Sequence, residues 1–382
     1  ARFVEEVHKR GMRVILDGVF NHCGSFNKWL DAEGIYEHSG DYEAGAYESK
    51  SSPYHSFFQF HDDSDGAWPY NRTYDGWWGH DTLPKLNYEN SEKLVEYILN
   101  VARKWVSPPY SIDGWRLDVA ADLGHTAEYN HEFWRRFRQA VKEANPEALI
   151  LAEHYGDPAS WLEGDQWDSI MNYDAFMEPV TWFLTGMEKH SDSYNGGIWG
   201  DGEAFFNAMG YHMSRMQTNT VMTAMNQLSN HDHSRFLTRT NQMVGRIQTA
   251  GPEKAGQNIK PCVFREAVVI QMTWPGAPTL YYGDEAGVCG WTDPDSRRTY
   301  PWGKEDLELI EFHRYMTGIH RKIPAFRKGA VKPLLAGYQK IAYGRMYGKY
   351  QAVVVISNSP DSQTMDIPVW QLGVTDDMVL GR

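Results

Sequence analysis

The sequence predicts an α/β barrel followed by a smaller antiparallel β domain, on three observations. Short apolar segments alternate with amphipathic helical patterns over most of the chain. Polar or acidic residues follow several of these segments, as in barrels whose sites lie at the carboxyl ends of parallel strands. After about residue 324 the pattern changes to short alternating runs between turn residues, which favours antiparallel strands.

The elements follow in order along the chain. Residues 1–10 are expected to end an amphipathic helix, which Gly11 terminates. Strands are expected at 12–16, 112–118, 148–153, 167–171, 223–228 and 278–282. Further helices are expected at 91–106, 129–144, 201–217, 262–274 and 307–322, the first of them capped by Asn90 or Ser91.

A long segment at 23–90 shows no clear period. It is rich in aromatic residues, and its end carries Trp77 and Trp78 beside many hydrogen-bonding groups. A loop of this length inside a compact domain is usually functional or a small inserted domain. These tryptophans are expected to line a cleft, with packing in an aromatic core as the alternative for each.

Composition narrows the class of partner. The chain has 382 residues, with 37 Lys and Arg against 50 Asp and Glu, a formal charge of −13. That charge argues against nucleic acid and gives no reason to expect an anionic membrane. Abundant Trp and Tyr, 15 and 22 residues, offer flat faces suited to sugar rings, although most of them belong to the core.

The cysteines and the ends of the chain indicate little about the function of the protein. Cys23, Cys262 and Cys289 are too few and too irregularly spaced for a disulfide framework or a zinc site. No apolar run has the length of a membrane span, and no signal peptide is visible. Because the chain begins without Met in a helical pattern, we expect its natural N-terminus to lie upstream.

The stretch 112–118 is the centre of the predicted site. It reads as a buried strand in which Arg116 and Asp118, two residues apart, share one face. A neighbouring guanidinium keeps a carboxylate ionised, which suits a nucleophile. A purely structural ion pair that closes the strand is the alternative reading of this stretch.

Three predicted strands end near acids that are far apart in sequence, namely Asp118, Glu153 and Asp232, with His22 and His231 beside them. The carboxyl ends of barrel strands converge, so these acids are expected to meet. Mutual repulsion makes one of them a proton donor beside an ionised partner, the division of labour that glycosidic cleavage needs. A metal site is the competing use, weakened by the absence of an H-E-x-x-H spacing.

Four segments, DGVFNH (17–22), GWRLDVAAD (114–122), LAEH (151–154) and LSNHD (228–232), resemble the four signature regions of glycoside hydrolase family 13, the α-amylase family. LPKLN (83–87) resembles a fifth region of the neopullulanase, amylopullulanase and cyclomaltodextrinase branch. Tyr155 stands where neopullulanases and cyclomaltodextrinases carry Trp, and Ala152 replaces the usual Gly. The amylopullulanase-like pattern therefore fits better. A Lys-His pair found in many true α-amylases is absent after Asp118.

The resemblance implies roles for individual residues. Asp118 would be the nucleophile, Glu153 the general acid/base, and Asp232 the stabiliser of the transition state. Substrate contacts would come from His22, Arg116, His231, His154, Tyr155, Trp77 and Trp78. No cofactor is needed for the chemistry, and Asn21 is a candidate ligand of a structural calcium ion.

The resemblance also implies an architecture. The family fold is a (β/α)8 TIM barrel, here at 1–325 and lacking its first two strands, with an inserted domain at 23–90 after the third strand. The segment 326–382 would be a C-terminal antiparallel β-sandwich, expected to be truncated.

The expected function is a bacterial, retaining glycoside hydrolase that cleaves α-1,4 and/or α-1,6 glucosidic bonds in starch-derived oligosaccharides, pullulan or cyclodextrins. The alternatives are a transglycosylase of the same family and a non-catalytic carbohydrate-binding fragment. The expected partner is an α-glucan or malto-oligosaccharide, not nucleic acid or membrane, and a homodimer is left open. A bacterial cytoplasmic location is favoured over secretion, since the sequence carries few cysteines.

Overall fold

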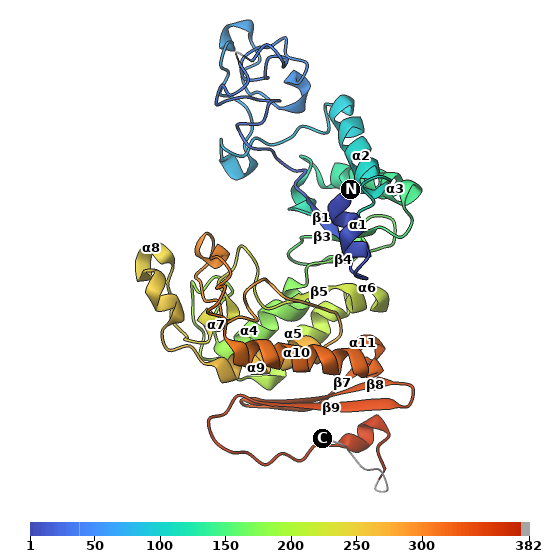
Figure 1. Cartoon of the computed structure of the whole chain (residues 1–382), viewed down its shortest axis with the longest axis vertical. Helices are drawn as coiled ribbons and strands as arrows, with labels where there is room; N and C mark the ends of the chain where they lie inside the picture. The colour runs from blue at the N-terminus through green and yellow to red at the C-terminus, as the bar shows by residue number, and fades with distance from the viewer. Residues whose placement is uncertain (38, 376–382) are drawn as a thin grey trace. The chain divides into compact units, whose positions relative to one another are not determined.

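The computed structural model describes residues 1–37 and 39–375 and consists of two compact units (Figure 1). The first unit contains residues 1–154 and 158–170, and the second contains 155–157 and the chain from 171 onward. Among the described residues, none of the helices combines the length and the apolar character that crossing a bilayer requires.

The first unit is built on a parallel sheet in the order β1-β2-β3-β4. Its strands are short: β1 (Ile15–Gly18), β2 (Gly114–Leu117), β3 (Leu149–Ala152) and β4 (Ser169–Ile170). Its helices are α1 (Arg2–His8), α2 (Glu92–Val106) and α3 (Ala127–Ala144). Each strand of β1 to β3 is followed in the chain by polar side chains, so the parallel order gathers those side chains at one edge.

The segment 23–90 of the first unit contains little regular structure, and Figure 1 draws most of it as loops, in blue. It carries short turns of helix at η1 (His55–Phe57), η2 (Asp65–Ala67) and η3 (Trp77–Gly79). Buried aromatic and aliphatic side chains hold it together, among them Trp29, Leu30, Phe57, Phe58 and Tyr88. Apolar burial of this kind gives an irregular segment a core of its own.

The second unit contains a pair of parallel strands, β5 (Met225–Gln227) and β6 (Ala277–Thr279), and Met171 extends the pairing through a parallel bridge to Met225. Its helices up to the C-terminal sheet are the π-helix η6 (Tyr173–Met177), α4 (Glu178–Thr185), α5 (Gly202–Met213), α6 (Thr218–Thr223), α7 (Phe236–Arg239), α8 (Ile247–Ala250), α9 (Pro261–Thr273), α10 (Leu307–Lys322) and α11 (Pro324–Lys328), with the short 3-10 helices η7 (Pro252–Gly256) and η8 (Asp295–Arg297) between them.

An antiparallel sheet follows α11, and the 3-10 helix η9 (Val369–Leu372) comes after it. Its strands β7 (Ala330–Gly337), β8 (Lys340–Tyr347) and β9 (Tyr350–Ser357) pair in sequence order, and β8 and β9 lie beside α11 (Figure 1). The ring of Tyr343 packs edge-on against Trp274, with centroids 5.0 Å apart, within the core of the second unit. The sheet is therefore joined to the helices by a shared apolar core, and the predicted antiparallel region is confirmed.

Most predicted elements are present with shifted ends. The helix expected at 91–106 is capped by Ser91, whose Oγ accepts from Leu94 N. The helix expected at 129–144 begins two residues earlier, because Thr126 caps it. The helix expected at 201–217 ends at Met213.

The strand expected at 12–16 is displaced and runs from Ile15 to Gly18. Its ladder begins only where Ile15 meets Gly114 of β2. Ahead of that point Val14 and Asp113 share two hydrogen bonds, from Asp113 N to Val14 O at 2.7 Å and from Val14 N to the Asp113 carboxylate at 2.8 Å. The shift places Asp17 inside the strand, directly opposite Arg116.

Candidate active site

Arg116 links three carboxylates of the first unit. Its Nη1 donates to Asp118 Oδ1 at 2.6 Å and to Asp17 Oδ1 at 2.8 Å, and its Nη2 donates to Glu153 Oε2 at 2.9 Å. Burial opposes the charge of the guanidinium, but the carboxylates of Glu153, Asp17 and Asp118 outweigh that effect and raise the pKa of Arg116. The arginine stays charged and holds Asp118 and Glu153 on one planar fork.

Glu153 is fixed by the backbone as well. It follows β3, is buried, and its Oε2 also accepts from Val119 N at 3.0 Å. Val119 adopts a left-handed conformation with φ of 38°, which is strained for a β-branched residue. The turn immediately after Asp118 therefore aims a peptide N–H at Glu153, and strain of this kind often marks a functional site.

His22 lies beside this group at the end of β1. Its ring stacks on Trp77, with centroids 5.2 Å apart and planes 11° apart, and its Nδ1 lies 3.1 Å from Asn21 Nδ2. Burial lowers the pKa of His22, against the opposing effect of the Asp118 charge. A neutral imidazole at this place can donate to or accept from a sugar hydroxyl.

Asn21 does not have the surroundings of a calcium ligand. Its Oδ1 accepts from Lys85 Nζ at 3.0 Å, and the same ammonium donates to the carbonyl oxygen of Asp122. Calcium needs six to eight oxygen ligands, and here an ammonium faces the amide oxygen that would be one of them. No cluster of three or more His, Cys, Asp or Glu side chains suited to a metal ion is found in the described part of the chain. The surroundings of Asn21 Oδ1 do not fit calcium.

Trp77 and Trp78 line a cavity of about 450 Å³ together with Asp122 and His125. The Trp77 indole is held by a hydrogen bond from Nε1 to Asp122 Oδ2 at 3.2 Å. Trp78 is 81% exposed and left-handed, with φ of 52°. A large apolar side chain held exposed on a strained backbone suits a contact with a ligand better than a contact with the core.

Asp232 and His231 belong to the second unit. His231 Nε2 lies 3.4 Å from Asp232 Oδ1, and Arg297 Nη2 lies 3.7 Å from the same oxygen. The carbonyl oxygen of Asp232 accepts from Thr292 Oγ1 and from Asp293 N. Two cationic or potentially cationic groups thus flank a half-exposed carboxylate whose backbone is fixed.

His154 and Tyr155, the two residues after Glu153, contact different aromatic side chains. The His154 ring contacts Trp167 and Trp161 in the first unit, at centroid distances of 5.7 and 6.1 Å. Tyr155, in the second unit, stacks on Tyr173 at 4.1 Å and 6°, and its hydroxyl lies 3.0 Å from His233 Nε2. His154 therefore contacts an aromatic cluster, whereas Tyr155 stays 44% exposed and can also meet a ligand.

Three residues at these sites were not singled out from the sequence. Lys85 lies inside the quoted LPKLN segment, so its position was visible but its contact with Asn21 was not. Arg297 stands in a charged run that gave no indication of Asp232 as its partner. Val119 is marked only by its backbone angles, which a sequence does not display.

Comparisons with known proteins show the family of this chain. The profile described as "Alpha amylase, catalytic domain" matches residues 1–323. Neopullulanase 2 of Thermoactinomyces vulgaris is 34% identical over 383 residues, which is 97% of this chain and 56% of that protein. Amylopullulanase of Thermoanaerobacter thermohydrosulfuricus is 30% identical over 407 residues, 96% of this chain and 25% of that protein.

Among solved structures, a debranching enzyme from Nostoc punctiforme superposes with a TM-score of 0.78 at 28% identity, covering 98% of this chain and 70% of that one. The chain spans between a quarter and a little over half of the two curated relatives named above. The proteins that match the α-amylase profile are built on a (β/α)8 barrel with a C-terminal β domain. The parallel strands and the antiparallel sheet of this chain agree with that architecture. With its family match over residues 1–323, the chain belongs to the α-amylase family of glycoside hydrolases, glycoside hydrolase family 13.

Proposed function

We propose that this chain is the catalytic part of a retaining glycoside hydrolase that cleaves α-glucosidic bonds of starch-derived oligosaccharides, pullulan or cyclodextrins. The observation that carries the proposal is the Arg116 guanidinium, which holds Asp118 and Glu153 at 2.6 and 2.9 Å. Two carboxylates fixed on one side chain can act on the same glycosidic bond, and retention requires them to be close together, roughly 5–5.5 Å apart.

In this mechanism Asp118 attacks the anomeric carbon while Glu153 gives a proton to the leaving oxygen. The bond to the leaving sugar breaks as the bond to Asp118 forms, which leaves a covalent glycosyl ester. Forming the ester removes the negative charge of Asp118, and Arg116 then faces Glu153 and Asp17 alone. That change favours the ionised form of Glu153, which takes a proton from the incoming water. The water oxygen then bonds to the anomeric carbon as the ester bond to Asp118 breaks, so that Asp118 leaves as a carboxylate and Glu153 is protonated again.

Asp232 is proposed to stabilise positive charge that develops on the sugar ring. His22, His231 and Tyr155 would position hydroxyl groups of the same sugar, while Trp77 and Trp78 would stack on neighbouring units. His154 would support this group through its contacts with tryptophans. The segment 23–90, as an inserted domain, would shape the cleft on the side of His22.

The names of the relatives support cleavage of α-glucosidic bonds as a class. Names such as neopullulanase and amylopullulanase describe proteins that are 30–34% identical to this chain. We propose α-1,4 cleavage, α-1,6 cleavage, or both.

The test uses the full-length protein with pullulan, soluble starch and β-cyclodextrin, followed by chromatography of the products. Panose from pullulan would indicate α-1,4 cleavage, and maltotriose would indicate α-1,6 cleavage. Proton NMR of the first product should show the α-anomer, since double displacement retains configuration.

Asp118→Asn should lower kcat by at least about 10⁴-fold, and Asp361→Asn, at an exposed carboxylate, should leave it unchanged. The β-anomer as first product, or an active Asp118→Asn variant, would refute the mechanism.

A further inference from the structure

His190 and Thr292 form a chain of hydrogen bonds that ends on the backbone of Asp232. The Thr292 hydroxyl donates to the carbonyl oxygen of Asp232, and His190 Nδ1 lies 2.7 Å from the same hydroxyl oxygen. All three residues belong to the second unit. The reaction proposed above assigns no task to His190 or Thr292.

The direction of these bonds follows from the protons that each group carries. A carbonyl oxygen only accepts, so Thr292 gives its single hydroxyl proton to Asp232, and its oxygen accepts from His190. Nδ1 of His190 therefore carries a proton, a tautomer that its partner assigns. Burial lowers the pKa of His190, against the opposing charge of Glu188, which favours a neutral ring with Nδ1 as its one N–H group.

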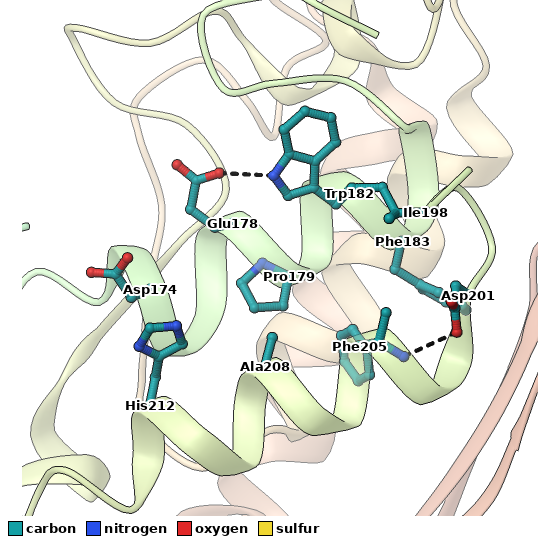
Figure 2. Close-up of a pocket in the computed structure, with 11 residues that line it drawn as sticks. Asp174, Glu178, Pro179, Trp182, Phe183, Ile198, Asp201, Phe205, Ala208 and His212 are labelled. Carbon is teal, nitrogen blue, oxygen red and sulfur yellow. Dashed lines mark hydrogen bonds between the residues drawn. The ribbon is translucent and has the colours of Figure 1, made fainter. Parts of the chain in front are cut away.

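The segment that carries His190 is itself fixed at two places. The carbonyl oxygen of Lys189 accepts from Ser234 N at 3.1 Å and from Ser234 Oγ at 2.9 Å. Lys189 Nζ lies 2.5 Å from Oε1 of Glu178 on α4. Figure 2 shows the other oxygen of that carboxylate accepting from Trp182 Nε1, at 3.2 Å. The imidazole donor is thus carried by a backbone that is bonded to α4 and to the loop that it supports.

The backbone of Asp232 is held on both sides of the residue. Its N donates to Asn230 Oδ1 at 3.0 Å, and its carbonyl oxygen accepts from Asp293 N at 3.2 Å as well as from the threonine. The carboxylate has looser contacts, with His231 Nε2 at 3.4 Å and Arg297 Nη2 at 3.7 Å, both longer than ordinary hydrogen bonds. The direction of the carboxylate therefore depends on the backbone that carries it.

We propose that His190 and Thr292 are positioning residues, which hold the backbone of Asp232 so that its carboxylate faces the charge that develops on the sugar. The inference rests on the proposed function, in which Asp232 stabilises that charge. Neither side chain needs to touch the substrate. Loss of either bond lets Asp232 shift, which weakens an interaction of the transition state more than the binding of the substrate.

The experiment compares variants of the full-length protein on α-maltosyl fluoride, whose fluoride is a good leaving group, so that slow variants stay measurable. Thr292→Val removes the hydroxyl and keeps the branched shape, whereas Thr292→Ser keeps the hydroxyl. Thr273→Val is the matched control, because Thr273 is also buried and its hydroxyl also bonds a carbonyl oxygen and a second side chain. A thermal melt establishes that each variant is folded.

A second pair of variants tests the histidine. His190→Phe keeps a planar ring and removes the donor to Thr292. His320→Phe is its control, since His320 is a half-buried histidine of the same unit whose Nδ1 lies 2.8 Å from a carbonyl oxygen, that of Met272.

We expect Thr292→Val to lower kcat about 10- to 100-fold and His190→Phe to lower it about tenfold, with KM within about threefold in both. Thr292→Ser should keep kcat within about threefold of the unchanged protein, and both controls should keep it within about twofold. On an Asp232→Asn background, Thr292→Val should lower kcat by less than about a further twofold, because the double-mutant cycle isolates an effect that acts through Asp232.

An unchanged kcat in Thr292→Val, or a loss of equal size in Thr273→Val, would overturn the inference. A loss that Thr292→Val adds in full to that of Asp232→Asn would overturn it too, since the effect would then not act through this carboxylate. If the unchanged protein released fluoride no faster than buffer and left starch intact, the proposed function would be refuted, together with the inference that rests on it.

Discussion

Lys85 places its ammonium group 3.0 Å from Asn21 Oδ1, at the amide oxygen that the sequence had marked as a candidate calcium ligand. Burial lowers the pKa of Lys85, against the opposing charges of Asp122, Asp75 and Glu89. The side chain of a lysine thus occupies the position at which a calcium ion would have to approach Asn21 Oδ1.

Chelation should therefore leave the protein unchanged. If Asn21 holds no calcium ion, we expect EDTA to shift Tm by less than about 1 °C, since a ligand that binds the folded state would add to stability through mass action. Lys85→Ala should lower the free energy of unfolding by about 1–3 kcal/mol, since two acceptors lose their donor. Thermal melts test both statements, with Lys304→Ala, an exposed lysine, as the control. A Tm lowered by EDTA and restored by calcium would contradict this account.

Arg116→Lys should retain the positive charge but lose the arrangement of hydrogen bonds that positions the carboxylates. An ammonium group is a point donor, whereas the guanidinium reaches Asp17, Asp118 and Glu153 from two nitrogens. We expect kcat to fall by about 10²-fold, because a shift of about 1 Å in the two carboxylates is enough for a loss of that size. Steady-state kinetics with maltotriose provide the measurement.

Arg135→Lys serves as the comparison for Arg116→Lys, since Arg135 pairs with the single carboxylate of Asp165 at a half-exposed position. Its kcat should stay within twofold of the unchanged protein. If Arg116→Lys behaved in the same way, the guanidinium would not be what positions the two acids.

Two variants of Trp78 should differ in stability but not in their effect on substrate binding. Its φ of 52° is strained for any residue with a Cβ, so Trp78→Gly should be about 1 kcal/mol more stable than Trp78→Ala. Both variants lose the exposed indole, and both should raise KM for long malto-oligosaccharides by a similar factor. Thermal melts and kinetics on the two variants decide the matter. An unchanged KM in both would remove Trp78 from the substrate site.

Glu266, on α9, should make the protein less stable as the pH rises. Burial raises the pKa of Glu266 to about 8 from its ordinary 4.5, and Oε2 has no hydrogen-bond partner in the described structure. Between these two pH values the folded chain holds a proton that the unfolded chain releases, so the free energy of unfolding falls with rising pH.

Replacement of Glu266 by Gln removes that proton uptake. Glu266→Gln should raise the free energy of unfolding at pH 7 by about 1–3 kcal/mol and should have little effect at pH 4. Urea unfolding at both pH values measures the difference, with Glu308→Gln, at a highly exposed carboxylate, as the control. An equal gain at both pH values would mean that the proton on Glu266 is not responsible.

The sequence by itself determined the family and the main chemical groups. Asp118 and Arg116 could be placed on one strand face because side chains alternate along a strand, and Glu153 could be placed near them because parallel strands end at one edge. Helices such as α2 and α10 followed from local periodicity, and the capping serine of α2 was one of the two residues considered. These are short-range properties that a linear sequence carries.

Only the tertiary structure decided which distant groups meet. The register that sets Asp17 opposite Arg116 joins residues 99 positions apart, and it moved β1 along the chain from the expected range. The contact of Lys85 with Asn21 spans 64 positions and changes a candidate calcium ligand into the acceptor of an ammonium group. The left-handed angle of Trp78 and the burial of Glu266 are likewise invisible in the sequence. Each depends on how packed elements enclose a side chain, and that enclosure fixes the local dielectric and partners that no local pattern encodes.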